Sequence, residues 1–438
     1  MQKLFSDFKP VSAADWKNQL IKDLKGEAYE NLIWQNENGF DIEPFYTAEN
    51  LKSTYEPAFT HAGWEICVSG KSNDSKELNR QLLRDLNNGA TAISVHINNH
   101  DIKTVLEGIQ LNYIKATFFV NEKNAATLKD YLEGAYNLNE INCSVFPDSL
   151  TTEKDFENWQ ALIKPFQNYK NFKTLSVDAL LYHNLNCLAY YEVAVIISAL
   201  TEYLEVYSKH ADFPYSDVVV KTGVSSDYFI QIAKLRAVHR LWNLLKEEYK
   251  IKNNLHLIVE TGLTNKSISD SYNNLLRTTM ESMAAVAGGC DELIVNEFDT
   301  LFETNKNLSE RMAINQQLIL KDESYLDKMA DIACGSFYIE SITDAIAAKA
   351  LETFKRFENE GGYFKCIEKN IFESDIALQA QQRAELVNDK KQIAIGVNKF
   401  KNEKEKIELS PADIIKLKQM PLNNPVLNFE LDNYFQHA

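Results

Sequence analysis

The sequence has no long apolar run. None of its apolar stretches approaches the ~20 residues that a helix needs to cross a bilayer. The first residues, MQKLFSDFKPVSAADW, carry lysine and aspartate among their apolar side chains, a pattern unlike that of a signal peptide. We therefore expect a cytoplasmic protein that does not contact a membrane.

Positive charge is also scarce. The chain has 46 Lys and Arg against 62 Asp and Glu, which gives a formal net charge of −16. Nucleic-acid phosphates and anionic lipids repel an acidic surface of this kind. We expect neither nucleic acid nor an anionic membrane as a partner.

Cysteine pairs are absent as well. The six cysteines are scattered, with no CxxC motif, and only Cys187 has a histidine nearby, His183. One such pair is too little for a metal site, so we expect no metal. Buried, reduced thiols are the simpler interpretation, and they suit a reducing compartment.

What the chain does have is a series of short β-rich runs separated by helical patterns. The segment 227–248, for example, carries an apolar stripe at helical spacing. Eight strands alternating with helices predict an α/β fold of the (β/α)8 TIM-barrel type, with a doubly wound open sheet as the alternative. The predicted strands are 64–69, 91–97, 116–121, 141–146, 173–178, 217–221, 255–260 and 292–296.

The stretch 270–299, DSYNNLLRTTMESMAAVAGGCDELIVNEFD, predicts a helix followed by a buried strand. The helix should begin near 267–270 and end at Gly288-Gly289, where a left-handed residue can terminate it. Its predicted apolar face consists of Leu276, Met280, Met283, Ala284 and Ala287.

The same stretch resembles a known family. The words YNN (272–274), RT (277–278), MAAV (283–286), GG (288–289) and FD (298–299) resemble the signature helix and strand of the acyl-CoA mutase barrel in the methylmalonyl-CoA mutase family. Near the start, KDLKG (22–26), LIW (32–34) and PFYT (44–47) resemble the opening of the small subunit in heterodimeric members. In that family the opening arm wraps the partner subunit.

The resemblance covers nearly the whole chain and is weakest over 100–170. Later words that carry it are DIACGSFYIESIT (331–343), QQR (381–383) and GVNKF (396–400). It implies three segments: an N-terminal arm (1–58) that wraps a partner, a (β/α)8 barrel (59–345), and a C-terminal helical extension with a linker remnant (346–438).

The barrel prediction selects the polar residues that follow the strands, because TIM barrels bind ligands at that face. Lys221 is the most reactive of them, since a desolvated lysine there could form a Schiff base, but an ion pair with a neighbouring strand-end carboxylate is the simpler alternative. The set is Ser69, Asn98, His100, Asn121, Asp148, Asp178, Lys221, Glu260 and Glu297.

The catalytic members of the family carry a Tyr-His pair after the fifth strand, beside the substrate. An ungapped comparison between Ser176 and Glu192 places that pair on Leu180-Leu181, which implies that it is lost. Tyr182-His183 lies two residues later. A local gap would restore these two residues to the catalytic position, whereas the alternative is that His183 is an ordinary loop histidine.

Two further departures concern the acyl-CoA contacts that the resemblance implies. Catalytic members read His-Cys-Gln-Thr before the signature helix, whereas residues 258–261 read IVET, so Ile258 and Glu260 replace an imidazole and an amide. Catalytic members also have an arginine-containing loop before the first strand, where 59–64 read FTHAGW. Both changes predict weaker binding of an anionic acyl-CoA thioester.

The family holds cobalamin through an Asp-x-His-x-x-Gly motif in a domain that follows the barrel. No such motif occurs in the sequence, and too few residues follow Phe400 to form that domain. We therefore expect no cofactor and no catalytic residue in this chain, with adenosylcobalamin held by the partner.

The prediction is a non-catalytic small subunit of a heterodimeric isomerase of propionate and succinate metabolism. Its partner would be the large, catalytic subunit of methylmalonyl-CoA mutase, which interconverts methylmalonyl-CoA and succinyl-CoA. One alternative is a catalytic acyl-CoA mutase barrel that recruits a separate cobalamin-binding protein. A second is an unrelated Schiff-base lyase that uses Lys221.

Overall fold

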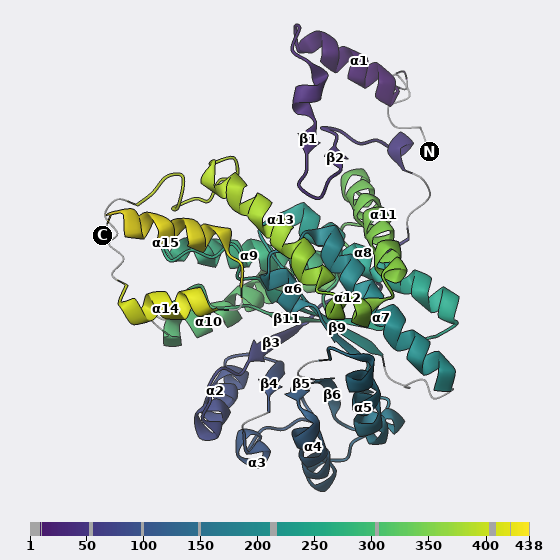
Figure 1. The fold of residues 1–438 in the computed structure, drawn as a ribbon, viewed down its shortest axis with the longest axis vertical. Helices are drawn as coiled ribbons and strands as arrows, with labels where there is room; N and C mark the ends of the chain where they lie inside the picture. The colour runs from purple at the N-terminus through teal and green to yellow at the C-terminus, as the bar shows by residue number, and fades with distance from the viewer. Residues whose placement is uncertain are drawn as a thin grey trace.

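The core of the molecule is a parallel sheet that is nearly closed into a barrel and lies among helices (Figure 1). A computed structural model describes residues 9, 11–51, 56–97, 100–147, 150–210, 217–302, 306–402, 409–420 and 422–437. Within these residues one sheet has the strand order β7-β6-β5-β4-β3-β11-β10-β9-β8, and every neighbouring pair is parallel. Its strands are β3 (Glu65–Ser69), β4 (Ala92–His96), β5 (Lys115–Val120), β6 (Asn142–Pro147), β7 (Phe172–Lys173), β8 (Ser176–Asp178), β9 (Val218–Val224), β10 (Leu255–Thr261) and β11 (Glu292–Ile294).

The barrel closes within the fifth predicted strand. That run is split, since β7 pairs with β6 and β8 pairs with β9, and only Thr174 and Leu175 separate the two pieces. Ser176 Oγ donates a 3.1 Å hydrogen bond to the Val145 carbonyl across the closure. All eight predicted runs contain strand, so the TIM-type barrel is confirmed and the open-sheet alternative is wrong.

Helices cover the barrel and continue beyond its last strand. Polar side chains begin several of them: Ser12, Asp74 and Thr152 each accept a hydrogen bond from a backbone N–H in the first turn. No helix in the described part of the chain is both long and apolar enough to span a membrane. After β3 the helices are α2 (Ser75–Asn87), α3 (Ile102–Val105), α4 (Glu122–Ala135), α5 (Glu153–Ile163), α6 (Leu180–Asn184), α7 (Ala189–His210), α8 (Tyr228–Tyr249), α9 (Tyr272–Ala287), α10 (Lys306–Leu318), α11 (Phe337–Asn359), α12 (Tyr363–Glu368), α13 (Ile371–Asn388), α14 (Pro411–Gln419) and α15 (Pro425–His437).

Helix α9 ends where expected, at Gly288, and begins at Tyr272, slightly later than expected; Ala284 and Ala287 of the predicted face are buried, but the rest of the buried face differs. Leu276 and Met280, predicted to be buried, are 66% and 44% exposed. The buried side instead carries Asn274 and Glu281 among small residues. Asn274 Nδ2 donates to two backbone carbonyls, and the Glu281 carboxylate accepts from Lys266 Nζ at 2.7 Å. Apolar periodicity missed this face because its polar groups find partners inside the protein.

A layer of apolar side chains fills the axis of the barrel. Ile258 of β10 stands in this layer with none of its surface exposed. Such filling is what turns a TIM barrel into a packed core instead of a pore. We call this layer the axial plug; its members, all at most 2% exposed, are Cys67, Ala92, Phe119, Phe146, Val219, Ile258 and Ile294.

The outer part of the N-terminal segment stands away from the barrel (Figure 1), whereas the turn of its ribbon packs on later helices, where Lys349 Nζ donates to the Asn38 carbonyl and Arg383 pairs with Glu37 at 2.9 Å. The segment contains α1 (Ala13–Asp23), the two-stranded ribbon β1 (Trp34–Gln35) and β2 (Asp41–Ile42), and the short turns η1 (Tyr29–Leu32) and η2 (Ala48–Asn50). At the other end, the boundary expected at residue 345 falls inside the continuous helix α11. No structural break therefore separates a barrel from a C-terminal extension at that point.

Arg236 of α8 anchors the chain that leads into the barrel. Its guanidinium is fully buried and lies 2.9 Å from Asp331 and 3.0 Å from Glu340. Asp331 also accepts a 2.8 Å hydrogen bond from the Ala58 backbone N–H. The cluster joins residue 58 to α8 and α11.

We expect Arg236→Met to lower the free energy of unfolding by about 3–5 kcal/mol, because two buried carboxylates would lose a cation. Urea denaturation measures this loss. The matched control is Arg80→Met, since Arg80 pairs with Glu77 at 2.6 Å with both side chains largely exposed; it should cost less than about 1 kcal/mol. Equal effects of the two substitutions would contradict the prediction.

Candidate functional site

The mouth of the barrel brings together three of the predicted strand-end residues, Asp178, Lys221 and Glu260. Lys221 Nζ lies 3.0 Å from Glu260 Oε2, and Asn296 Nδ2 donates to Glu260 Oε1 at 2.9 Å. The Lys221 ammonium also sits 5.0 Å from the ring centre of Phe119. The acid and the base at the centre of the mouth are thus paired with each other.

Other members of the predicted ring have partners outside this cluster. Glu297 pairs with Lys71. His100 Nδ1 lies 3.1 Å from Ser75 Oγ, and Asn121 caps the N-terminus of α4. Asn98 and Asp148 lie outside the described residues.

The electrostatics of Lys221 oppose its use as a Schiff-base nucleophile. Burial alone would lower the pKa of its ammonium, but Glu260 and Asp178 outweigh burial and hold that pKa above its usual value. Burial would likewise raise the pKa of Glu260, yet Lys221 and Asn296 hold it below the usual value. A nucleophilic lysine needs the opposite, a lowered pKa.

His183 is not an ordinary loop histidine, as the simpler alternative had it. It belongs to α6 and is only 4% exposed. Its Nδ1 lies 3.0 Å from Glu192 Oε2, and Lys234 Nζ donates to the same oxygen at 2.8 Å. Thr222 Oγ1 donates to the other oxygen of Glu192.

Two glycines make the space for the His183 ring. A Cβ at Gly223 or Gly262 would collide with the imidazole, so the ends of β9 and β10 leave a slot for it. The sequence patterns do not mark either glycine or Lys234 as part of a site, and they give Glu192 only as a position that matches the family. One signal was present, since Lys234 falls on the apolar stripe of α8 between Ile230 and Ala237, where a lysine needs a buried partner.

The positions that the resemblance marks as changed occupy different environments. Ile258 lies in the axial plug, Glu260 stands above it in the paired mouth, and Leu181 is 53% exposed. Leu180, at the start of α6, is partly exposed, and its backbone N–H donates to Asp178 at 3.0 Å. Aliphatic side chains at 180 and 181 supply no acid or base.

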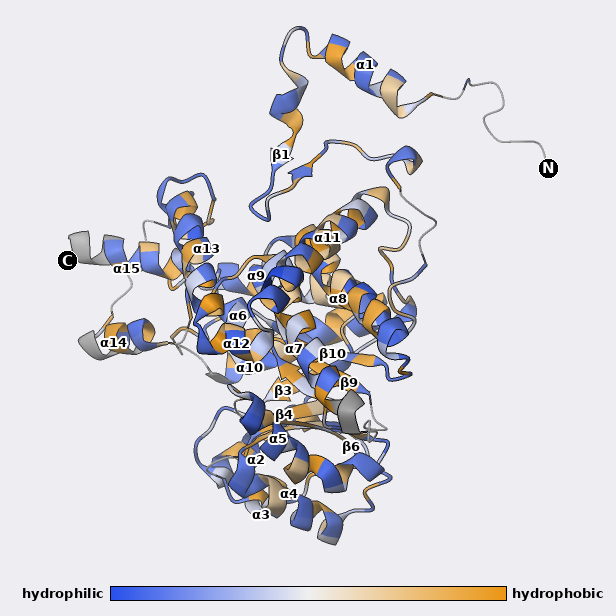
Figure 2. Cartoon of the chain, turned by 45° about the vertical axis from the view of Figure 1, so that its right-hand side comes forward, coloured by the Kyte–Doolittle hydropathy of each residue, from blue (hydrophilic) through white to orange (hydrophobic). Residues whose placement is uncertain are grey.

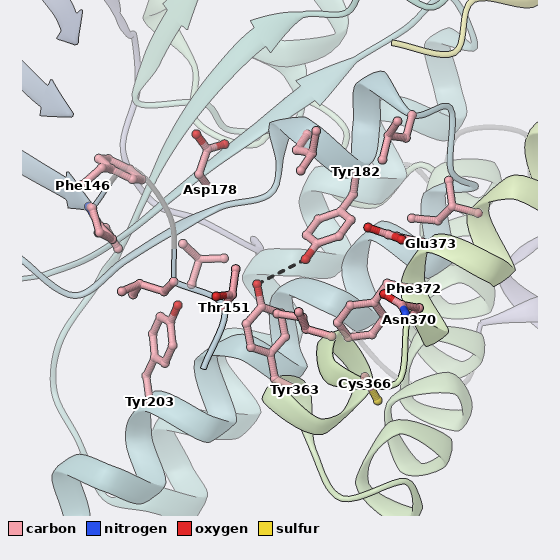
Figure 3. A pocket seen from close by; sticks show the side chains of 18 residues that line it. Phe146, Thr151, Asp178, Tyr182, Tyr203, Tyr363, Cys366, Asn370, Phe372 and Glu373 are labelled. Carbon is pink, nitrogen blue, oxygen red and sulfur yellow. Dashed lines mark hydrogen bonds between the residues drawn. The ribbon is translucent and has the colours of Figure 1, made fainter. Parts of the chain in front are cut away.

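A cavity of about 270 Å³ opens beside these leucines (Figure 3). Asp178 and Leu181 line it from the barrel side, and α12 and α13 close the other side. The hydroxyls of Tyr182 and Tyr363 lie 3.3 Å apart in its wall. Among the described residues no group of three or more His, Cys, Asp or Glu side chains is placed to hold a metal ion.

His183 should make stability depend on pH. Burial lowers its pKa, against the opposing pull of Glu192. Because the folded pKa lies below the unfolded value of about 6.5, the unfolded chain takes up the proton first. The stability present above about pH 6.5 is therefore lost as the pH falls below it.

Below about pH 6.5 the free energy of unfolding of the original protein should fall as the pH falls. We expect His183→Gln to reduce the slope of this fall by up to about 1.4 kcal/mol per pH unit. Urea denaturation of both proteins between about pH 7.5 and about pH 5 measures the two slopes. Burial also lowers the pKa of His239, to about 4. Because His239 is present in both proteins, its effect on the dependence of stability on pH is the same in both and cancels in the comparison. Identical slopes would show that His183 does not titrate in this way.

Comparison with known proteins agrees with the resemblance. The family model described as methylmalonyl-CoA mutase matches residues 150–423. The methylmalonyl-CoA mutase small subunit of Porphyromonas gingivalis is 30% identical over 445 residues, covering 92% of this chain and 71% of that protein. The methylmalonyl-CoA mutase of Rhizobium meliloti and the human mitochondrial enzyme are each 25% identical over 92% of this chain.

The chain spans 65% of the length of the Rhizobium protein and 62% of the human one. The matched region includes β8 to β11, the His183 slot and helices α11 to α13. The chain belongs to the methylmalonyl-CoA mutase family.

Proposed function

We propose that this chain is the non-catalytic small subunit of a two-chain methylmalonyl-CoA mutase. In this proposal the large subunit holds adenosylcobalamin and interconverts methylmalonyl-CoA and succinyl-CoA. The small subunit supports that reaction by stabilising and positioning its partner.

The observation that carries the proposal is the axial plug together with the paired mouth above it. Ile258 stands where the family has an acyl-CoA contact, and it is inaccessible. Glu260, at a second such position, is a carboxylate bound to Lys221. A thioester anion would have to open the plug and break a buried ion pair to lie there, and both steps are costly.

The N-terminal arm supports the need for a partner. No residue of α1 is buried, and an isolated helix of 11 residues is marginal in water. Trp34 and Phe45 are 50% and 41% exposed. Figure 2 colours several positions of this arm as hydrophobic, and its first helix lies far from the barrel. A second protein surface would bury these side chains, as the family resemblance implies.

The alternative of a catalytic barrel with a separate cobalamin-binding protein is less well supported. It needs an accessible acyl-CoA site, whereas the plug closes the axis and aliphatic residues occupy 180 and 181. The Schiff-base alternative needs a free lysine, whereas Lys221 is ion-paired.

The proposal predicts a one-to-one complex with a larger chain. The measurement is the native mass of the purified complex with adenosylcobalamin present.

Trp34→Ser should weaken assembly of this complex by about tenfold or more, because Trp34 would lie between the arm and the partner. The matched control is Tyr113→Ser, because Tyr113 is an 85% exposed aromatic residue on the barrel, outside the arm. A lone chain that turns over methylmalonyl-CoA with only a cobalamin-binding protein added would overturn the proposal.

The proposal also predicts that the isolated chain lacks an acyl-CoA site. Calorimetric titration with CoA and with methylmalonyl-CoA should show no micromolar dissociation constant, because the mouth offers a carboxylate in place of an amide. Glu260→Gln should not create such affinity, since Ile258 still blocks the axis. Micromolar binding by either protein would contradict this prediction.

A further inference from the structure

The cavity beside α6 has an unusual chemical character for a member of this family. Its 18 lining residues, all described, include two carboxylates, Asp178 and Glu373, and no lysine, arginine or histidine. Figure 3 shows the two acids on either side of the Tyr182 and Tyr363 pair in this view. A site built for an anionic acyl-CoA would need the reverse charge.

The wall between the acids is aromatic. The ring centres of Tyr182 and Tyr363 lie 5.8 Å and 5.6 Å from that of Phe372. Phe146 and Tyr203 extend the same lining towards the end of β6 and towards α7. Ring faces attract cations through their quadrupoles, and the two tyrosine hydroxyls can also accept hydrogen bonds.

Asp178 stands where the cavity meets the mouth, and Lys221 compensates its carboxyl only in part. It is next to Lys221 in the strand register, but Lys221 already pairs with Glu260 at 3.0 Å. Two carboxylates therefore share one ammonium at the mouth. Although Asp178 is accessible to solvent from the cavity, the surrounding protein raises the pKa of its carboxyl, with Lys221 as the main opposing influence. A bound cation would relieve this unfavourable environment.

We propose that this cavity binds a small organic cation, an ammonium group carried on an apolar body. The carboxylates would hold the charge, and the rings of Tyr182, Tyr363 and Phe372 would surround the body. The volume of about 270 Å³ limits the ligand to a small molecule. The net charge of −16 favours the approach of cations to the protein. All the residues named for the site belong to this chain.

Three probes with one phenyl body and different charges test the proposal. They are 2-phenylethylammonium, the neutral 2-phenylethanol and the anionic 3-phenylpropionate, each titrated calorimetrically into the full chain to about 10 mM. We expect saturable binding of the ammonium, binding of the alcohol weaker by about fivefold or more, and no binding of the carboxylate.

Substitutions locate the binding. Glu373→Gln and Asp178→Asn should each weaken binding of the ammonium by about threefold or more. Glu385→Gln is the matched control, because Glu385 is an exposed acid on the same helix, α13, and does not line the cavity. It should leave the affinity unchanged, and thermal unfolding confirms that each variant is folded.

Three results would overturn the proposal. They are no binding of the ammonium over this range, equal or tighter binding of the alcohol or the carboxylate, and equal effects of Glu373→Gln and Glu385→Gln. None of them bears on assembly with a large subunit, which the native mass measures separately.

Discussion

In a small parallel barrel, inward-pointing side chains fill the axis. In this structure the apolar nature of those side chains determines how the polar residues at the two ends of the barrel are arranged. The axial plug is apolar and buried, and polar side chains stand on either side of it along the barrel. A charged side chain next to this apolar layer is partly buried and needs a partner, because an unpaired buried charge is costly. We therefore expect ion pairs or hydrogen bonds among the polar side chains at both ends of the barrel, which we call its rims.

The rims show this pairing on both sides of the plug. At the N-terminal ends of the strands, His256 Nε2 lies 2.7 Å from Glu292 Oε1, and Lys173 Nζ donates to Asn142 Oδ1 at 2.7 Å. At the C-terminal ends, Lys221 and Glu260 form the corresponding pair. In TIM-barrel enzymes the C-terminal rim carries the reacting groups. Here the Lys221 ammonium and the Glu260 carboxylate at the centre of this rim form an ion pair, as the charged side chains of the N-terminal rim also find partners.

The sequence predicted the elements better than their orientation. Eight β-rich runs were enough to predict the barrel, because apolar runs and helical stripes are local signals. The same apolar pattern placed Leu276 and Met280 on the buried side of α9, where Asn274 and Glu281 stand instead. The error has a physical cause, since Lys266 and distant carbonyl groups satisfy those polar side chains and no local pattern reveals such partners. The splitting of the fifth strand was likewise not foreseen, because it arises when the two ends of the sheet meet.

The Tyr182-His183 pair shows why residue type alone does not establish a catalytic role. Helix α6 begins directly after β8 and turns His183 inwards, into the slot that Gly223 and Gly262 leave open. There the imidazole meets Glu192 and Lys234, whose charges already balance, and burial keeps the ring neutral. A general base must reach the proton that it removes, and this ring is 4% exposed and does not line the cavity beside α6. Tyr182, one residue earlier, faces the cavity, but its pKa is raised well above the usual value by burial, so it remains a neutral phenol. The dipeptide therefore places one side chain, His183, in the packed interior and the other, Tyr182, in the wall of the cavity.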